Sequence, residues 1–344
     1  MTTSAITNSA ERENVLLFGL GGIGGIYACI LHLSGKCDVS VVARSNYKAV
    51  SEKGFKLVSP KFGDHPSIKF AGVYRDCEEA AQSGKKFSYV LCANKALLDA
   101  VPSLSDNLRP VITPGLTSIV LLQNGVGAEA PLHASFPDTT VISAVVWTGG
   151  KTLPEENGVA GVEQFNREGL TIGVDYREGG DRAEEEAKLE KLVGWLAAGK
   201  GDCNVVKDIQ SERWIKVIWN CCWNSLTTVT RIKTNRIFES SDEALPLCYT
   251  LMREVEAVAK AKGLNIPEGT VERLIKECTD VKTGLPSSMM FDNFAGRPME
   301  TEVILGTPVK EGKRLGVPVP TLLTLYTIVK ALDYGNAHPD LCKI

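Results

Sequence analysis

The sequence has few of the patterns from which metal centres, disulfide frameworks and membrane spans are built. Its four histidines stand apart from one another and near no motif, so we expect no metal site. Its ten cysteines are scattered and form no C-x-x-C pair, which is typical of a reducing, intracellular location. No apolar run approaches the roughly 18 residues of a transmembrane helix. We therefore expect a cytoplasmic protein that makes no membrane contact.

The charge and length of the chain narrow its class further. The 344 residues carry a formal net charge of −3 and no basic block, so a nucleic-acid partner is not expected. Because single cores stop growing near about 250–300 residues, this length favours two domains. Residues 1–14 are polar and lack the apolar core of a signal peptide, so we expect a disordered tail there.

A glycine-rich loop near the N-terminus carries the strongest local signal. An apolar strand at residues 15–18 runs into a G-x-G-x-x-G loop, and a helical stretch at 25–33 and a second strand at 38–43 follow. Within about 30 residues this order predicts a dinucleotide site rather than a glycine-rich turn without a ligand. The first glycine permits a tight turn, the second lets the backbone approach a pyrophosphate, and the third lets the helix pack closely against the strand. The N-terminus of the helix then offers free N–H groups that bind phosphate. The residues expected to bind the cofactor in this loop are Gly19, Gly21, Gly22, Ile23 and Gly24.

The end of the second strand indicates which dinucleotide binds. An NAD site has an acid about 20 residues beyond the third glycine, where it binds the ribose 2′-hydroxyl. This chain has Arg44 there, followed by Ser45 and Asn46, and no acid. A guanidinium can bind a phosphate through two parallel hydrogen bonds, so the pattern favours NADPH/NADP+. The alternative is that Arg44 is only a solvated residue at a strand end.

The remaining pattern divides the chain into an α/β part and a helical part. Continuous apolar runs at 89–93, 118–122 and 140–146, with helical material between them such as 95–108, predict a doubly wound, Rossmann-type sheet. A more polar region of strands and loops follows at 149–176, with a loop at 152–158, and then a helix at 182–198. The later helical stretches are 212–229, 243–262, 267–276, 300–316 and 320–333. We therefore expect an NADP-binding Rossmann-type domain at 15–207 and an all-helical substrate and catalytic domain at 208–344.

Two polar residues directly follow strands of the predicted sheet. Lys95 comes after the run at 89–93, and Asn124 comes after the run at 118–122 and opens a Gly-x-Gly turn. In a doubly wound sheet the ligand lies beyond the carboxyl ends of the strands, so both residues are candidates for the cleft. Taken alone, each could equally be a solvated lysine or an asparagine in a turn.

The first helix of the helical part carries a polar stripe on an otherwise apolar surface. Lys216, Asn220 and Asn224 recur at four-residue intervals, which places them on one face. A buried ammonium and two buried amides are costly unless they have partners. The stripe could face another helix, or it could face a cleft that holds a polar substrate. In the second case Lys216 is a candidate proton donor, because burial can bring its pKa towards the working pH.

A lysine in that position needs a carboxylate or a substrate anion nearby. Glu300 begins a predicted helix after Gly296 and Pro298, and Glu302 is a competing candidate. Upstream, the hydroxyls of Ser287 and Ser288 are suited to binding a carboxylate or hydroxyl group. Glu300 could also be an ordinary acid of a first helical turn, where the helix dipole favours it.

Taken in order along the chain, these elements resemble the ketopantoate reductases (2-dehydropantoate 2-reductases). The resemblance runs from about Val15 to Asp333 and is most specific in the Lys216/Asn220/Asn224 stripe, the Ser287-Ser288-Met289 segment and Glu300. It implies an NADPH-binding Rossmann domain, a helical domain and an active site between them. The roles it implies are Lys216 as general acid, Glu300 as its positioning partner and a substrate contact, Asn124, Asn220, Asn224 and Ser288 as substrate-binding residues, and Lys95 and Asn124 as residues beside the cofactor.

The implied reaction is the NADPH-dependent reduction of 2-dehydropantoate to pantoate, a step of pantothenate biosynthesis. Several departures from the family pattern leave the substrate open, including Ser225 after Asn224, Met299 before Glu300, and the tryptophans of the 214–223 segment. The alternatives are a related NADP-dependent dehydrogenase that acts on another keto acid or an imine, and an inactive NADP(H)-binding sensor. A homodimer is possible, but the periodicity does not show one.

Overall fold

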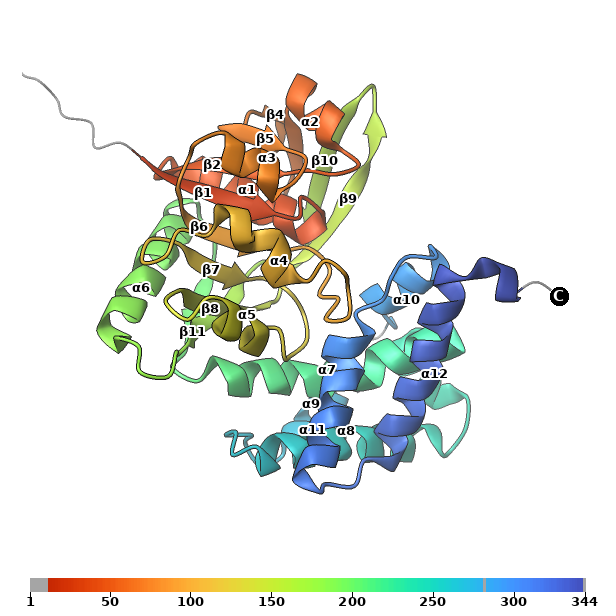
Figure 1. Cartoon of the computed structure of the whole chain (residues 1–344). Helices are drawn as coiled ribbons and strands as arrows, with labels where there is room; N and C mark the ends of the chain where they lie inside the picture. The colour runs from red at the N-terminus through yellow and green to blue at the C-terminus, as the bar shows by residue number, and fades with distance from the viewer. Residues whose placement is uncertain (1–11, 281–282, 343–344) are drawn as a thin grey trace, which may run out of the picture.

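The computed structural model describes residues 12–280 and 283–342, in which an α/β domain precedes a helical domain (Figure 1). Most of the predicted tail at 1–14 lies outside the described residues. Glu13 and Asn14, the last two residues of that predicted tail, are not disordered, because they belong to strand β1 (Glu13–Phe18). Their register with Cys37 and Asp38 of the neighbouring strand shows why: backbone pairing fixes them although their side chains are polar.

The α/β domain is built on an eight-stranded sheet in the order β12-β11-β8-β7-β6-β1-β2-β5. All neighbours are parallel except β11, which runs antiparallel to β8. The chain reverses its direction of travel across the sheet between β1 and β6, which is the switch point where such sheets bind ligands. The predicted doubly wound sheet is confirmed. Its strands are β1, β2 (Cys37–Val42), β5 (Gly72–Tyr74), β6 (Phe87–Cys92), β7 (Ser118–Leu121), β8 (Thr140–Val146), β11 (Leu170–Asp175) and β12 (Cys203–Val205).

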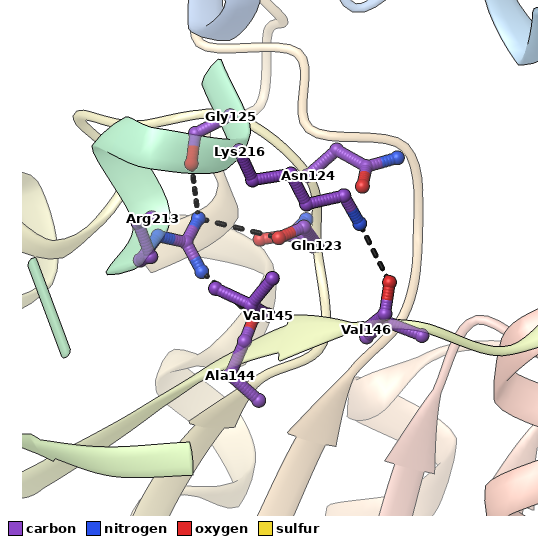
Figure 2. A pocket seen from close by; sticks show the side chains of 8 residues that line it. All are labelled: Gln123, Asn124, Gly125, Ala144, Val145, Val146, Arg213 and Lys216. Carbon is purple, nitrogen blue, oxygen red and sulfur yellow. Dashed lines mark hydrogen bonds between the residues drawn. The ribbon is translucent and has the colours of Figure 1, made fainter. Parts of the chain in front are cut away.

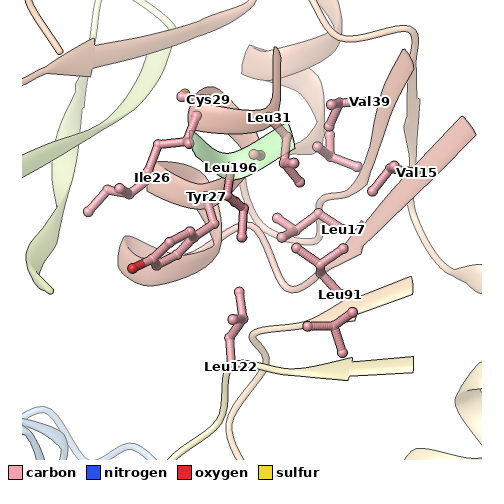
Figure 3. Close-up of a cluster of buried hydrophobic side chains, with 14 of the residues drawn as sticks. Val15, Leu17, Ile26, Tyr27, Cys29, Leu31, Val39, Leu91, Leu122 and Leu196 are labelled. Carbon is pink, nitrogen blue, oxygen red and sulfur yellow. The ribbon is translucent and has the colours of Figure 1, made fainter. Parts of the chain in front are cut away.

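Both faces of this sheet are buried, which explains the continuous apolar runs. Leu17 and Leu91 point to one face and pack in a cluster with residues of α1 and α6 (Figure 3). Leu16 and Val90 point to the other face, where they pack with residues of α3, α4 and α5. The covering helices are α1 (Gly22–Ser34) and α6 (Arg182–Ala198) on the first face, and α3 (Cys77–Gln82), α4 (Leu104–Leu108) and α5 (Glu129–Ser135) on the second; α2 (Tyr47–Lys53) follows β2.

A second, four-stranded sheet lies beside α1. Strands were expected within 149–176, but a separate sheet was not predicted. Its order is β4-β3-β10-β9, with bounds β3 (Phe55–Val58), β4 (His65–Ile68), β9 (Gly149–Glu156) and β10 (Val159–Phe165). The loop predicted at 152–158 is therefore mostly strand, and only Asn157 and Gly158, both with positive φ, form the turn. Most residues of β9 are exposed, so the strand lacks the apolar alternation that would have revealed it.

The helical material predicted at 95–108 is also largely wrong. Only α4, at Leu104–Leu108, is α-helical, and residues 95–103 form a loop. Pro102 disfavours a helical conformation at Val101, and Ser103 and Asp106 then form a capping box that starts the helix. The helix predicted at 182–198 is confirmed, with Asp181 as its N-cap.

The helical domain surrounds the long helix α7 (Ile209–Thr230), most of whose residues are buried. The helix predicted at 300–316 begins with a π-helical turn, η3 (Glu302–Gly306), before α11. Helix α10 was missed because its seven residues are too few to show a periodicity. In the described residues no strand follows β12, and no helix is long and apolar enough to cross a membrane. The other helices are α8 (Ala244–Ala261), α9 (Thr270–Thr279), α10 (Ser288–Phe294), α11 (Thr307–Leu315) and α12 (Pro320–Ala337), with short 3-10 turns η1 (Arg109–Val111), η2 (Thr234–Glu239) and η4 (Pro339–Cys342).

Arg213 fastens α7 to the carboxyl edge of the large sheet. Its guanidinium lies 2.9 Å from Glu129 Oε1, and both side chains are almost fully buried. It also donates hydrogen bonds of 2.6–3.2 Å to Ser143 Oγ and to the backbone carbonyls of Gln123, Gly125 and Ala144. A buried guanidinium is tolerated only when it is paired and hydrogen-bonded in this way. The helix that carries the polar stripe is therefore held against the strand ends.

We expect Arg213→Met to lower the free energy of unfolding by about 3–5 kcal/mol, because it leaves Glu129 buried without its partner. Urea unfolding of the purified protein measures the loss. The double variant Arg213→Met/Glu129→Gln, in which the uncompensated charge is also removed, should recover part of it. A single variant as stable as the wild type would show that Arg213 does not fasten α7.

Candidate functional site

Six of the residues predicted for the site line one cavity at the carboxyl edge of the sheet. The cavity has a volume of about 360 Å³ and lies between the large sheet and the helical domain. Residues of α1, of the loops after β7 and β8, of α7 and of α10 contribute to its walls. The six predicted residues are Ile23, Asn124, Lys216, Asn220, Asn224 and Ser288. The fold thus brings the dinucleotide loop and the polar stripe of α7 to the same space.

Lys216 is held in the cavity wall by the strand end opposite it. Its Nζ donates a 2.6 Å hydrogen bond to the carbonyl oxygen of Val146 (Figure 2). The same nitrogen lies 5.3 Å from the ring centroid of Trp147. Burial, and then the positive charge of Arg213, lower the pKa of Lys216 to about 8, while the charge of Glu300 opposes this shift. A lysine with such a pKa can donate and regain a proton near neutral pH.

The two asparagines of the stripe present unpaired amides to the cavity. Asn220 and Asn224 are buried, yet neither side chain has a hydrogen-bond partner among residues 12–280 and 283–342. Ser288 adds an exposed hydroxyl at the start of α10. The hydroxyl of the neighbouring Ser287 is engaged within the protein. It accepts a hydrogen bond from Met290 N, which caps α10, and it is hydrogen-bonded to a hydroxyl group of α7. Because these amides are open to the cavity and have no protein partner, this wall is suited to a polar ligand.

Glu300 lies behind the cavity wall rather than beside Lys216. One of its carboxylate oxygens accepts a 3.0 Å hydrogen bond from the backbone N–H of Ala96, and the other lies 3.4 Å from Asn124 Nδ2 and 3.8 Å from Lys95 Nζ. In the described residues no hydrogen bond or ion pair joins it to Lys216, so it acts on that lysine through its charge. Glu300 thus positions Asn124 directly.

The competing candidate Glu302 is turned away from the cavity. Its carboxylate pairs with Lys310 at 2.7 Å and with Lys330 at 3.0 Å, and it accepts a hydrogen bond from Tyr326. Burial raises its pKa, but these hydrogen bonds outweigh that effect and lower the pKa to about 2. Glu302 therefore serves the packing of α11 and α12 and remains ionised.

Lys95 joins the two domains in this structure. Its Nζ lies 2.5 Å from Asp292 Oδ2 on α10, and Asp292 also pairs with Arg297. Burial disfavours the charged form of Lys95, but Glu300 and Asp292 outweigh burial and raise its pKa. Lys95, which was predicted to lie beside the cofactor, therefore lies where the α/β domain contacts α10.

The glycine loop has the shape that a dinucleotide requires. Gly19 has a φ of +104°, and a Cβ there would lie 2.4 Å from the backbone nitrogen of Asn94. A Cβ on Gly24 would lie 2.1 Å from the oxygen of Gly19, so the helix packs tightly against the turn. A Cβ on Gly21 would meet no atom within 4 Å. Gly21 is also the N-cap of α1 and offers no side-chain cap, which leaves the first-turn N–H groups available to an anion.

Arg44 stands exposed at the end of β2, beside this loop. Its guanidinium carbon lies 5.7 Å from the ring centroid of Phe18, and no ion pair involves it in the described part of the chain. Asn46 donates a 3.1 Å hydrogen bond to the carbonyl of Leu20, which ties the segment that follows Arg44 to the glycine loop. These residues fit a dinucleotide with an additional phosphate near Arg44. Among the described residues no cluster of histidine, cysteine and carboxylate side chains is suited to a metal ion.

Two family models match the chain. The model described as "Ketopantoate reductase PanE/ApbA" matches residues 15–173, and its C-terminal counterpart matches residues 208–333. The chain belongs to this family. Membership identifies it as an oxidoreductase of the ketopantoate reductase type, which acts on a keto or hydroxyl group, and family members use NAD(P)H.

Individual relatives span nearly the whole chain. A 2-dehydropantoate 2-reductase of Nostoc is 26% identical over 331 residues, which cover 96% of this chain and 98% of the relative. The uncharacterized protein YDL144C of Saccharomyces cerevisiae is 29% identical, with 92% of each chain covered. The crystal structure of 2-dehydropantoate 2-reductase from Methylococcus capsulatus superimposes with a TM-score of 0.80 at 30% identity, covering 94% of this chain and 97% of that one.

One more distant structure shares the fold. A ternary structure of D-mandelate dehydrogenase with NADH and anilino(oxo)acetate has a TM-score of 0.77 at 20% identity and covers 94% of this chain and 99% of the other.

Sequence reasoning missed the residues that hold Lys216 in place. Val146 contributes only its backbone carbonyl, which the identity of the side chain does not reveal. Trp147 follows the strand as an ordinary aromatic residue. Arg213 was missed because an arginine in the first turns of a helix is usually solvated. Its only sequence signal is its position, three residues before Lys216 on the same helix.

We expect Gly21→Ala to weaken nicotinamide dinucleotide binding at least tenfold without loss of stability, because the added methyl group enters open space that a pyrophosphate would need. Fluorescence titration with NADPH and NADH gives the dissociation constants, and thermal unfolding gives the stability. Gly194→Ala on α6 is the matched control, since a Cβ there also meets no atom within 4 Å. Unaltered affinity in Gly21→Ala would exclude the loop as the pyrophosphate site.

Proposed function

We propose that the protein reduces a 2-keto acid to a 2-hydroxy acid with NADPH, and that 2-dehydropantoate, which gives pantoate, is a substrate. The observation that carries this proposal is the place of Lys216. Its ammonium lines the same cavity as Ile23 of the dinucleotide loop, and its pKa is lowered to about 8. A proton donor and a cofactor loop on one enclosed space are what the reduction of a ketone requires.

The choice of NADPH is supported by the end of β2. The glycine loop and the N-terminus of α1 would hold the pyrophosphate, and Arg44 would bind the 2′-phosphate. Because Arg44 has no ion pair in the described residues, its guanidinium is available for a phosphate. No acid stands near it in sequence to accept the 2′-hydroxyl of NADH.

The side chains of the cavity divide the remaining work. When bound, the reduced nicotinamide supplies a hydride to the carbonyl carbon of the substrate. Lys216 donates a proton to the carbonyl oxygen, which becomes the hydroxyl of the product, and then regains a proton from solvent. Asn220, Asn224 and Ser288 would bind the carboxylate and orient the keto group. Glu300 keeps Asn124 in place, and its negative charge favours the protonated form of Lys216.

The division of labour between the domains forms part of the proposal. Residues 15–207 would bind the cofactor, and residues 208–344 would supply the proton donor and the substrate contacts. An inactive sensor is disfavoured, because the cavity retains the ammonium of Lys216 and also two asparagine amides that have no protein partner among the described residues. The homodimer stays a prediction.

Lys216→Met should lower kcat for 2-dehydropantoate by at least a thousandfold while NADPH still binds, because the proton donor is lost. In the wild type the ammonium form is the active one, so kcat/KM for reduction should fall as pH rises through the pKa of Lys216. That midpoint should lie at or above about 8, since the negative charge of a bound cofactor favours the ammonium. Stopped-flow rates at saturating NADPH between pH 6 and pH 10 would give the profile. A variant with normal turnover would remove Lys216 from the mechanism.

Arg44→Ala should raise the dissociation constant for NADPH at least tenfold more than that for NADH, because only NADPH carries the 2′-phosphate. Equilibrium titration with both cofactors measures the difference. Arg167→Ala, which removes an arginine on the loop between β10 and β11, controls for the loss of a positive charge. Equal weakening of both cofactors by Arg44→Ala would contradict the proposed 2′-phosphate pocket.

A further inference from the structure

Helix α7 presents two adjacent stripes to the cavity. Lys216, Asn220 and Asn224 form the polar stripe, and Trp219 and Trp223 also line the cavity. At about 100° per residue the two tryptophans lie next to the polar residues on the helix surface and form a parallel aromatic stripe. A ligand that lies across α7 therefore contacts amides and an ammonium at one end and indole rings at the other.

The aromatic stripe is held rigidly. The rings of Trp219 and Trp223 meet edge to face with their centroids 5.7 Å apart, and Trp223 meets Phe238 in the same manner, also at 5.7 Å. Trp223 is almost completely buried, whereas Trp219 is only partly buried. Because Trp223 is fixed from behind by Phe238, the two indoles form a preformed apolar surface rather than a flexible one.

The remaining walls near the aromatic stripe extend this apolar surface. Leu285 and Pro286, which precede α10, and Cys278 of α9 line the same cavity. The cationic group that lines it is Lys216, on the polar stripe. Thr234 and Ser287 also line this end, but their hydroxyls are engaged by hydrogen bonds within the protein. An apolar group bound here would be removed from water on several sides.

We infer that the substrates of this enzyme include 2-keto acids with an aromatic or branched apolar side chain, which binds against Trp219 and Trp223 while the keto acid group binds the polar stripe. This inference rests on the proposed function and specifies its substrate class. The gem-dimethyl group of 2-dehydropantoate would occupy part of the same surface, and a phenyl ring would cover more of it. Trp219 and Trp223 are thus specificity-determining residues.

The test compares phenylpyruvate with 2-dehydropantoate in the wild type and in Trp219→Ala. We expect the wild type to reduce phenylpyruvate with a kcat/KM within tenfold of that for 2-dehydropantoate. Trp219→Ala should lower the ratio of kcat/KM for phenylpyruvate to kcat/KM for 2-dehydropantoate at least tenfold, because the phenyl ring loses more contact than the gem-dimethyl group does. The conservative variant Trp219→Phe should restore most of that ratio. Trp195→Ala is the matched control, since Trp195 is also partly buried but packs on Tyr89 in the α/β domain.

A binding measurement separates this inference from the proposed reaction. Calorimetric titration of the enzyme–NADP+ complex with 3-phenyllactate should show binding that Trp219→Ala weakens at least tenfold. If neither keto acid is reduced but this binding is seen, the apolar site stands and the proposed reaction fails. If 2-dehydropantoate is reduced but phenylpyruvate is not, or if Trp219→Ala affects both substrates equally, the inference is overturned and the reaction stands.

Discussion

The site is built around a partly buried lysine ammonium at the junction of two domains. Lys216 can stay there because a strand end supplies the carbonyl of Val146 as its acceptor. The buried guanidinium of Arg213, one helical turn earlier, fixes α7 against the same strand ends and lowers the pKa of the lysine. Burial and a neighbouring positive charge thus bring the pKa of this lysine towards neutral pH, which the proposed role of proton donor requires. The same packing that builds the fold sets the chemistry of the site.

The two domains meet through charged groups that surround this lysine without neutralising it. Glu300 pairs with Ala96 N–H, Asn124 and Lys95, so its charge reaches Lys216 only over a distance. A direct ion pair would raise the pKa of Lys216 and remove the ammonium from the cavity. Because Glu300 acts only from a distance, the ammonium of Lys216 stays available to a ligand, and the negative charge of Glu300 still favours the protonated form of this lysine.

Sequence predicted the parts of the fold that depend on local patterns. Buried strands such as β6 and β8 appear as continuous apolar runs, and α6 carries its own cap and charge pairing, so both kinds of element were found. The exposed strand β9 and the short helix α10 lack such patterns, because their positions are set by neighbours that are distant in sequence. The candidate site divides in the same way: the stripe on α7 was visible, but Val146 O, Trp147 and the direct partners of Glu300 arise only when strands and helices meet.

The most direct test of the central claim is the titration of Lys216 itself. NMR observation of the Lys216 ammonium nitrogen, assigned by comparison with Lys216→Met, would follow its protonation in the free enzyme. We expect a midpoint of about 8, against the ordinary lysine value of 10.5. A midpoint at or above 10.5 would show that neither burial nor Arg213 acts on this lysine, and it would contradict its role as a proton donor near neutral pH.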